Sequence, residues 1–279
     1  MRDVGIPERV HAGALLTGRA RSLQQRNGAA KTVARGHQQV RRNEIQCGHA
    51  APAGPLVASG RDSEIFEYGP GLVLRRSRKR RSMEREAKVM GYVAQHGYPV
   101  PRVEEISADG SELVMERIDG PTMFEVLSRH PWTLWRHASV LAALHDRLHE
   151  IPGPQWLDPF LAGGNCLVHS DLHPLNVILS PKGPVVIDWA NAARGVGPAD
   201  VALIWLVMIA AELPEGGAQA IVARVFRRLF VRSFLGHFDL APVRAALPVV
   251  GMWKCQDPNM RAAEVASMQR LVARESGRP

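Results

Sequence analysis

The sequence predicts an α+β fold in which a small sheet-rich lobe precedes a larger helical lobe. Short apolar stretches separated by Gly and Pro, with one helical pattern among them, lie between residues 56 and 116. Longer patterns of helical period follow from residue 133 onward. The chain of 279 residues is long enough for two such lobes around a shared cleft.

The first lobe is expected to hold an antiparallel sheet and one helix. Turn residues at Gly69-Pro70-Gly71 and Asp109-Gly110 separate the apolar stretches, which is typical of strands joined by hairpins. The helical stretch carries Glu84 and Glu86 in its first turn, where acidic residues favour a helix start. The expected strands are residues 64–68, 72–75, 103–106 and 113–116, and the expected helix is 82–95.

The second lobe is expected to be mostly helical. Its longest apolar run, Val201 to Ala211, is shorter than the about 20 residues that span a bilayer, so it predicts a buried helix. Two short apolar runs flank Pro181-Lys182-Gly183 and predict a hairpin. The expected helices are residues 133–149, 200–212, 217–234, 241–254 and 261–274, and the hairpin strands are 177–179 and 185–187.

The net charge of +8 lies mostly in the first 50 residues, where nine Lys or Arg residues stand against three acidic ones. Residues 1–52 show no sustained period and are rich in Arg, Gln, Ala and Gly, so they are expected to be a disordered basic tail. A nucleic-acid-binding arm and an extension without function both fit that composition. No specific nucleic-acid partner is expected for the folded part.

The cysteines indicate a reducing compartment. Cys47, Cys166 and Cys255 are far apart and lack the spacing of metal ligands or of a disulfide framework. The first residues are polar and lack the apolar stretch of a secretory signal. The expected location is therefore the cytoplasm, with no membrane partner and with the oligomeric state left open.

Asp171, Asn176 and Asp188 form the most informative pattern. Pro174 prevents a regular helix between Asp171 and Asn176, so a loop can direct both side chains into one cleft. Asp188 follows the second hairpin strand and can reach the same metal ion as Asn176. Phosphoryl transfer to an alcohol needs these parts, because one carboxylate must deprotonate the hydroxyl while oxygen ligands hold Mg²⁺ on the phosphates.

The motif His169-x-Asp171-x-x-x-x-Asn176, with Ile187-Asp188, resembles the catalytic loop and metal-binding segment of the aminoglycoside phosphotransferase and choline kinase-like family, distant relatives of protein kinases. The resemblance implies a two-lobed protein-kinase-like fold, with ATP and Mg²⁺ as cofactors. It also implies Asp171 as the catalytic base and Asn176 and Asp188 as Mg²⁺ ligands. His169 would orient the loop through hydrogen bonds.

Two positions depart from the family pattern. Ser170 stands where the family commonly has Gly, and Trp189 replaces the Phe of the protein-kinase Asp-Phe-Gly segment. Neither change removes a required oxygen ligand, and Trp189 favours the small-molecule branch. The resemblance extends over residues 56–274.

A nucleotide site in the first lobe is also implied by the resemblance. Residues 72–75 resemble the strand that bears the phosphate-anchoring Lys, with Arg75 in its place, and Glu86 would be the acidic partner. Because side chains alternate along a strand, Arg75 rather than Arg76 should face the cleft. The phosphate-covering loop, residues 59–63, has a single glycine where protein kinases use three.

The connection between the lobes would meet the adenine. Residues 113–118 resemble the inter-lobe hinge, with backbone contacts at Glu116 and Ile118. The implied domains are a nucleotide-binding lobe at 53–117 and a catalytic and acceptor-binding lobe at 118–279.

Four further residues have more than one reading. Asp200 resembles the family residue that caps the next helix and braces the catalytic loop, and helix capping is its expected role. His173 would contact a phosphate or brace the loop. His145 and His149 lie four residues apart on one helix, and a metal site there would need a third ligand that the sequence does not indicate.

The acceptor is expected to be a hydroxylated small molecule that is neutral or mildly charged. From residue 201 onward six acidic residues stand against ten basic ones, which disfavours a highly cationic aminoglycoside. Four tryptophans are candidates for an aromatic wall or for core packing, namely Trp132, Trp135, Trp156 and Trp253. The alternative function is a nucleotide-binding pseudokinase with a regulatory role, favoured by Arg75 and the single-glycine loop.

Overall fold

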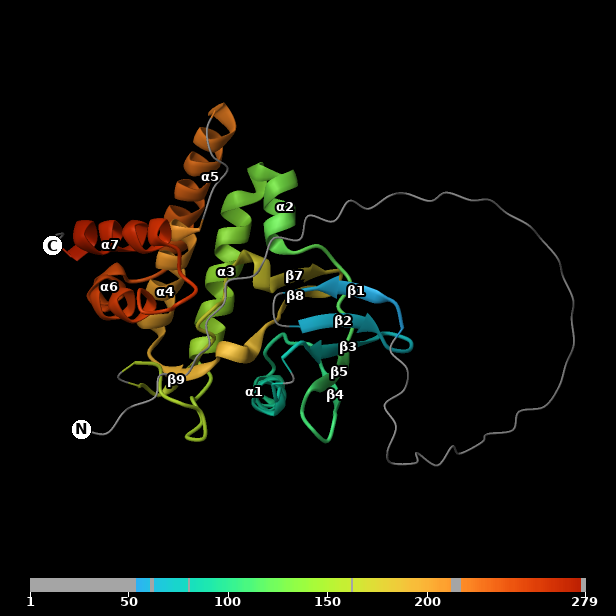
Figure 1. Ribbon diagram of the computed structural model, residues 1–279. Coiled ribbons are helices and arrows are strands. Elements are labelled where there is room, and N and C mark those ends of the chain that lie inside the picture. Colours follow the sequence, from blue (N-terminus) through green and yellow to red (C-terminus); the bar gives the residue numbers. More distant parts are fainter. Residues whose placement is uncertain (1–53, 61–62, 80, 162, 212–216, 277–279) are drawn as a thin grey trace, which may run out of the picture.

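The computed structural model describes residues 54–60, 63–79, 81–161, 163–211 and 217–276. A sheet with one helix stands beside a larger group of helices, so the predicted α+β class and two-lobed arrangement are confirmed (Figure 1). The expected tail at residues 1–52, and Arg61 and Asp62 of the expected phosphate loop, lie outside the described residues.

A five-stranded antiparallel sheet has the strand order β1-β2-β3-β5-β4. Its strands are β1 (Leu56–Ser59), β2 (Ser63–Glu67), β3 (Leu72–Ser77), β4 (Val103–Ile106) and β5 (Glu112–Glu116). The pairing of β3 places Arg75 between Ile65 of β2 and Leu113 of β5. The four predicted strands are confirmed, whereas β1 is an additional edge strand of mostly exposed residues.

Helix α1 (Glu84–Gln95) is the predicted helix of this lobe. It buries Val89, Met90 and Val93, and it packs against β4 and against the segment that follows Asp188. Glu86 is buried on the same helix, in its first turn. The helix therefore carries an acidic side chain from the sheet lobe toward the predicted site residues.

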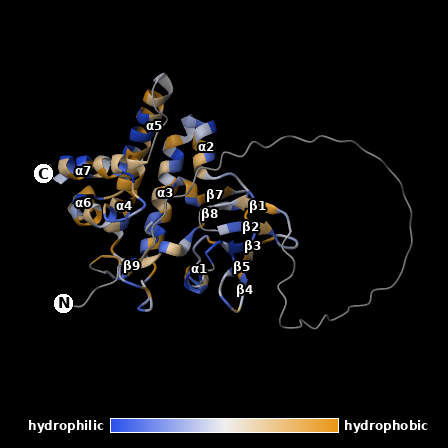
Figure 2. Ribbon diagram, in the orientation of Figure 1, coloured by the Kyte–Doolittle hydropathy of each residue, from blue (hydrophilic) through white to orange (hydrophobic). Residues whose placement is uncertain are grey.

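The helical lobe contains the five predicted helices and one more. They are α3 (Leu134–His149), α4 (Gly197–Ala210), α5 (Gly217–Leu235), α6 (Leu240–Lys254) and α7 (Ala262–Ser276), preceded by the additional α2 (Met123–Arg129). Helix α4 packs against the other four long helices and is mostly buried, which confirms the predicted buried helix. Helices α5 and α7 carry both hydrophilic and hydrophobic residues (Figure 2). None of the described helices is long and apolar enough to cross a membrane.

Two small sheets hold the predicted catalytic segment, residues 169–176. Strand β6 (Cys166–Val168) pairs with β9 (Ala193–Gly195), and β7 (Val177–Ser180) pairs with β8 (Gly183–Val186) in the predicted hairpin. Strand β6 ends immediately before His169 and β7 begins immediately after Asn176. Both ends of the intervening loop are therefore fixed by strand pairing.

Candidate active site

The catalytic loop, defined here as residues 169–176, centres on the buried Asp171. A short 3₁₀ helix at Pro174–Asn176 turns Asn176 back toward it. The amide nitrogen of Asn176 donates to the Asp171 carbonyl at 2.9 Å and to its carboxylate oxygen Oδ2 at 3.3 Å. With the nitrogen facing Asp171, the amide oxygen of Asn176 is the atom left to bind a cation.

His173 also lies against Asp171. Its Nε2 is 3.3 Å from Asp171 Oδ1, and its ring is buried. Burial alone would lower the pKa of His173, but the Asp171 carboxylate raises it above its ordinary value. His173 therefore braces Asp171 within the loop, which is one of the two roles that the sequence left open.

Asp188 lies beside Asn176 at the end of the hairpin. The amide of Ile187 donates to the Asn176 carbonyl at 3.0 Å, so Asp188 follows directly the residue that is bonded to Asn176. Its backbone has a φ of 66°, in the left-handed region. Burial raises the pKa of Asp188 to about 6; the charge of Arg75 opposes this rise and that of Glu86 adds to it. A bound cation would favour the ionised carboxylate.

Arg75 connects the sheet to these residues. Its Nη1 donates to Glu86 Oε1 at 2.5 Å, its Nη2 is 3.6 Å from Asp188 Oδ1, and its Nε donates to Ser63 Oγ at 3.1 Å. Burial opposes the charged form, yet the carboxylates of Glu86 and Asp188 raise the pKa of Arg75. Arg76 instead pairs with Glu112 at 2.6 Å. Of the two arginines, Arg75 therefore contacts the predicted site residues, as alternation along the strand requires.

Two further contacts, made by the side chain of Arg85 and by the backbone amide of Trp189, were not predicted from the sequence. The guanidinium of Arg85 donates to the carbonyls of Ala190 and Ala192 at 3.0 and 2.6 Å, and the Trp189 amide donates to Glu86 Oε1 at 3.2 Å. Both contacts join α1 to the segment after Asp188. The only sequence signal for the Arg85 contact was its position next to Glu86. A single arginine belongs to no recognisable motif, so this signal did not predict the contact.

Glu116 and Ile118 lie where the chain leaves β5 for the helical lobe. The Glu116 amide donates to the Arg102 carbonyl at 2.8 Å, and the Glu116 carboxylate accepts from the Arg102 amide at 3.3 Å. The amide of Glu116 is thus engaged within the protein. An adenine at this connection would meet the Glu116 carbonyl rather than its amide.

The expected capping role of Asp200 is wrong. Helix α4 begins after Val196 without a side-chain cap, and Asp200 lies in its first turn with its side chain fully buried. Asp200 Oδ1 accepts from the Ser170 amide at 2.9 Å and Oδ2 from the His169 amide at 3.4 Å. Its carboxylate therefore braces the catalytic loop, which is the other role that the resemblance implied.

Core packing does not explain three of the four tryptophans. Trp132, Trp135 and Trp156 expose 70, 62 and 39% of their surface, whereas Trp253 packs edge-on against Phe160 at 5.1 Å. An aromatic wall for the acceptor stays a hypothesis for the exposed three.

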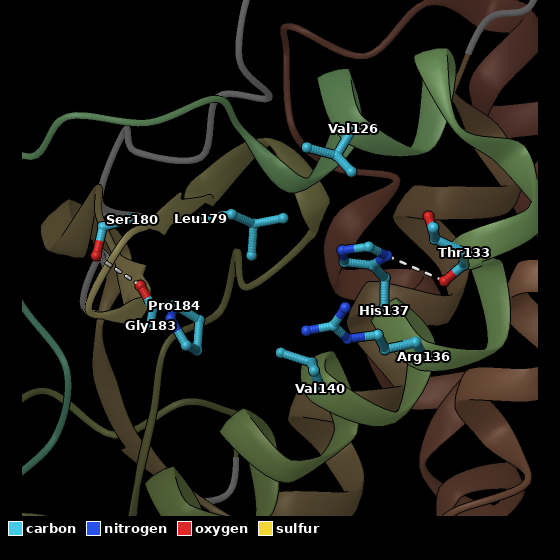
Figure 3. A pocket seen from close by; sticks show the side chains of 9 residues that line it. All are labelled: Val126, Thr133, Arg136, His137, Val140, Leu179, Ser180, Gly183 and Pro184. Atoms are coloured by element: carbon cyan, nitrogen blue, oxygen red, sulfur yellow. Dashed lines mark hydrogen bonds between the residues drawn. The ribbon is translucent and has the colours of Figure 1, made fainter.

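A separate cavity of about 330 Å³ lies between α2, α3 and the β7–β8 hairpin (Figure 3). Arg136 and His137 of α3 face Leu179 and Pro184 of the hairpin across it. None of its lining residues belongs to the predicted nucleotide or metal site.

The small antiparallel sheet with one helix, the buried Asp-x4-Asn loop and the helical lobe together form a protein-kinase-like fold. Residues 125–238, less than half of the chain, match the sequence model of the phosphotransferase enzyme family named APH. The comparison with curated proteins found no match. The resemblance to aminoglycoside phosphotransferases and choline kinase-like proteins is therefore confirmed by the family match and the fold.

Solved structures of three proteins have this fold. A thermostable mutant of aminoglycoside phosphotransferase APH(4)-Ia, in a ternary complex with ADP and hygromycin B, is 18% identical over 81% of this chain and 94% of its own, with a TM-score of 0.58. ADP-bound aminoglycoside phosphotransferase APH(2'')-Ib is 14% identical over 78% and 90%, with a TM-score of 0.51. A choline/ethanolamine kinase family protein from Mesorhizobium loti is 14% identical over 84% and 90%, with a TM-score of 0.50. At such identities the likeness shows the fold.

Proposed function

We propose that this chain is an ATP- and Mg²⁺-dependent phosphotransferase that moves the γ-phosphate of ATP to a hydroxyl group of a small molecule. The family match and the nucleotide-bound structures of similar fold support a nucleotide-using phosphotransferase. The observation that carries the proposal is the position of Asn176, which contacts Asp171 on one side and pairs with Ile187, next to Asp188, on the other.

Asp171 is proposed as the catalytic base. Its carboxylate, held by Asn176 and His173, would accept the proton of the acceptor hydroxyl as the oxygen attacks the γ-phosphate. The donor set also fits Mg²⁺, because the amide oxygen of Asn176 and the carboxylate of Asp188 are the oxygen ligands that this ion prefers. Bound Mg²⁺ would supply charge neutralisation on the phosphates.

The nucleotide is proposed to lie between the lobes. The planar guanidinium of Arg75 would bind phosphate oxygens bidentately, with its orientation fixed by Glu86 and Ser63. Adenine would meet the backbone at Glu116 and Ile118. This assignment makes residues 53–117 the nucleotide-binding lobe and residues 118–279 the catalytic and acceptor-binding lobe.

The acceptor is proposed to be a neutral or mildly charged hydroxylated metabolite. A similar fold binds hygromycin B together with ADP, which supports a small molecule as the acceptor. In this chain, however, α5 carries four arginines and no acidic residue, so it offers nothing to attract a polycation. The cytoplasmic location and the absence of a nucleic-acid partner stay predictions.

Phosphate transfer across a panel of acceptors tests the proposal. The full chain is mixed with ATP, Mg²⁺ and one acceptor at a time, drawn from neutral sugars, simple alcohols, choline-like compounds and kanamycin-like compounds, and ADP release is measured. We expect turnover with a neutral or singly charged alcohol. Efficient phosphorylation of kanamycin-like compounds alone would contradict the acceptor class, whereas nucleotide binding without transfer to any acceptor would favour the pseudokinase alternative that Arg75 suggested.

Asp171→Ala should separate chemistry from binding. Loss of the base should lower turnover by about 1,000-fold or more, while affinity for Mg-ATP stays within about threefold, because the carboxylate acts on the hydroxyl rather than on the nucleotide. Calorimetry and steady-state kinetics measure the two effects. Asp146→Ala, at an exposed position on α3, is the control that should leave both unchanged. Unchanged turnover in Asp171→Ala would eliminate this residue as the base.

A further inference from the structure

Behind the catalytic loop, His145 and His149 of α3 meet Asp200 of α4 in a buried cluster. Asp200 Oδ2 is 3.0 Å from His149 Nε2 and 3.6 Å from His145 Nδ1. The three ligand atoms all lie within 4.8 Å of one another. The third ligand that the sequence did not indicate is thus 51 residues away from His149, on another helix.

The tautomer of His145 leaves one ring nitrogen without a partner. Its Nε2 lies 3.1 Å from the Leu172 carbonyl, and since a carbonyl can only accept, Nε2 carries the proton. Its Nδ1 is fully buried and has no hydrogen-bond partner among the described residues. In the neutral ring, this nitrogen directs a lone pair toward the Asp200 carboxylate, an unfavourable arrangement unless positive charge lies between them.

The separations suit a tetrahedral transition metal. Two bonds of about 2.0–2.1 Å that meet at a tetrahedral angle place their ligand atoms about 3.3 Å apart. The two observed separations, 3.0 and 3.6 Å, lie on either side of that value. Two imidazoles and one carboxylate form a ligand set typical of Zn²⁺, whereas Mg²⁺ prefers oxygen ligands alone.

The hydrogen bonds around His145 and Asp200 also resemble those that metal-binding side chains make with neighbouring groups. A histidine that binds a metal usually donates its other ring N–H to a carbonyl or carboxylate, as His145 does to Leu172. Ligating carboxylates are themselves hydrogen-bonded, as Asp200 Oδ1 is by the Ser170 amide. Phe234 covers the His145 ring at 5.4 Å between centroids and limits the access of water.

We propose that His145, His149 and Asp200 bind a Zn²⁺-type ion that fastens α3 and α4 to the back of the catalytic loop. This site is distinct from the Mg²⁺ site proposed for Asn176 and Asp188, and it is structural, since the ion contacts no reacting atom. It does not depend on the phosphotransferase assignment. The competing occupant is a proton, which would make His145 an imidazolium paired with Asp200.

Metal titration of the full chain tests the site. Chelator-treated protein is titrated with Zn²⁺ by calorimetry and with Co²⁺ by absorption, because Co²⁺ in a tetrahedral site gives strong ligand-field bands. The chain has eleven histidines and three cysteines, so sites are counted as the difference between wild type and variants. We expect one site in the wild type that is weakened at least about 100-fold in His149→Gln and is absent from the double variant His145→Gln/His149→Gln.

His137→Gln is the matched control. His137 is also a buried histidine of α3 whose ring nitrogen contacts a backbone carbonyl, that of Thr133 at 3.0 Å, but it lies outside the cluster. This variant should keep the Co²⁺ bands and the rise in Tm on adding Zn²⁺. Asp188→Asn should keep them as well, because the two metal sites are separate, and this outcome holds whether or not the chain transfers phosphate.

Equal metal stoichiometry in the wild type and the double variant would overturn the proposal, as would tetrahedral Co²⁺ bands that persist in the double variant. If the double variant does not fold, the wild type alone decides. Absence of tight Zn²⁺ binding, or of a Tm increase with Zn²⁺, would assign the cluster to the protonated His145–Asp200 pair instead.

Discussion

Asp188 and Asp200 lie near opposite ends of the catalytic loop, Asp188 next to the residue that is bonded to Asn176 and Asp200 bonded to His169 and Ser170, and their surroundings contrast. The Asp188 side chain is 35% exposed, its nearest basic atom is 3.6 Å away, and its pKa is raised to about 6. Asp200 is fully buried; burial alone would raise its pKa, but its interactions with His145 and His149 hold the pKa well below its usual range. In the first case the protein destabilises the ionised carboxylate, and in the second it stabilises it.

This difference separates a carboxylate positioned for a ligand from one positioned for the fold. A bound cation stabilises the ionised form of a carboxylate that lies near other acidic groups. Asp188 is therefore suited to bind Mg²⁺. The carboxylate of Asp200 already accepts from two loop amides and lies within hydrogen-bond distance of His149. Asp188 is therefore placed to respond to a ligand, whereas Asp200 keeps the catalytic loop in one conformation.

Asp200→Ala should produce the largest effect. It removes a buried charge and leaves the amides of Ser170 and His169 without an acceptor, so the free energy of unfolding should fall by about 3–5 kcal/mol. Urea unfolding measures this loss. Asp239→Ala is the matched control, because Asp239 is a true N-cap that accepts from the Ala241 amide at 3.0 Å and should cost only about 1 kcal/mol. Equal losses in the two variants would show that Asp200 is merely a cap.

Asp188→Asn should have the opposite profile. Turnover should fall at least about 100-fold, because a proposed Mg²⁺ ligand loses its charge. Stability should stay within about 0.5 kcal/mol of the wild type, since the folded protein disfavours the ionised form of Asp188. Kinetics at several Mg²⁺ concentrations and urea unfolding measure the two effects. A large loss of stability with unchanged turnover would reverse the roles assigned to the two carboxylates.

His169 should make stability depend on pH. Burial lowers the pKa of His169 to about 4, from about 6.5 in the unfolded chain. Between these values the unfolded state binds the proton more tightly, so stability is complete above pH 6.5 and is lost as the pH falls toward 4, by about 3 kcal/mol at most. His169→Gln can still donate to the Ile187 carbonyl but cannot titrate. The difference in unfolding free energy between the two proteins should follow this curve, and a difference independent of pH would show that folding does not lower the pKa of His169.

Periodicity predicted every long helix and four of the five strands of the large sheet, because those patterns are local in the sequence. It did not predict α2, β6 or β9, which have seven, three and three residues and depend on partners elsewhere in the chain. Short elements carry too few residues for a period, and their pairing is decided by the tertiary fold.

The residues of the candidate site also differ in how far the sequence could predict them. The residues of the Asp-x4-Asn motif could be identified because they are close in sequence and chemically distinctive. For Asp200 the resemblance implied both a cap and a brace, and only the structure separates them, because the two roles differ in which amides lie near the carboxylate. The cluster with His145 and His149 depends on a contact across 51 residues between two helices, which no spacing rule describes.

Ser170→Gly should have the smallest effect of these variants, and it is the most direct probe of the part of the loop that contacts Asp200. Ser170 has a φ of 61°, which costs a residue with a Cβ about 1–2 kcal/mol, and its Oγ is buried without a hydrogen-bond partner among the described residues. Against this stands the entropy that glycine adds to the unfolded chain, about 0.4–1 kcal/mol. We expect a net gain of about 1 kcal/mol in the free energy of unfolding, measured by urea unfolding.

Ser170→Ala resolves the two contributions, because it removes the hydroxyl and keeps the Cβ. The order of stability should be Gly, then Ala, then Ser. If Gly and Ala are equally stable, the cost lies in the hydroxyl and the backbone is not strained. If Gly is less stable than Ser, the entropy that glycine adds to the unfolded chain exceeds the strain and the buried hydroxyl that it removes. The comparison therefore separates the cost of the backbone conformation from the cost of the buried hydroxyl, while the bond from the residue 170 amide to Asp200 is kept in all three proteins.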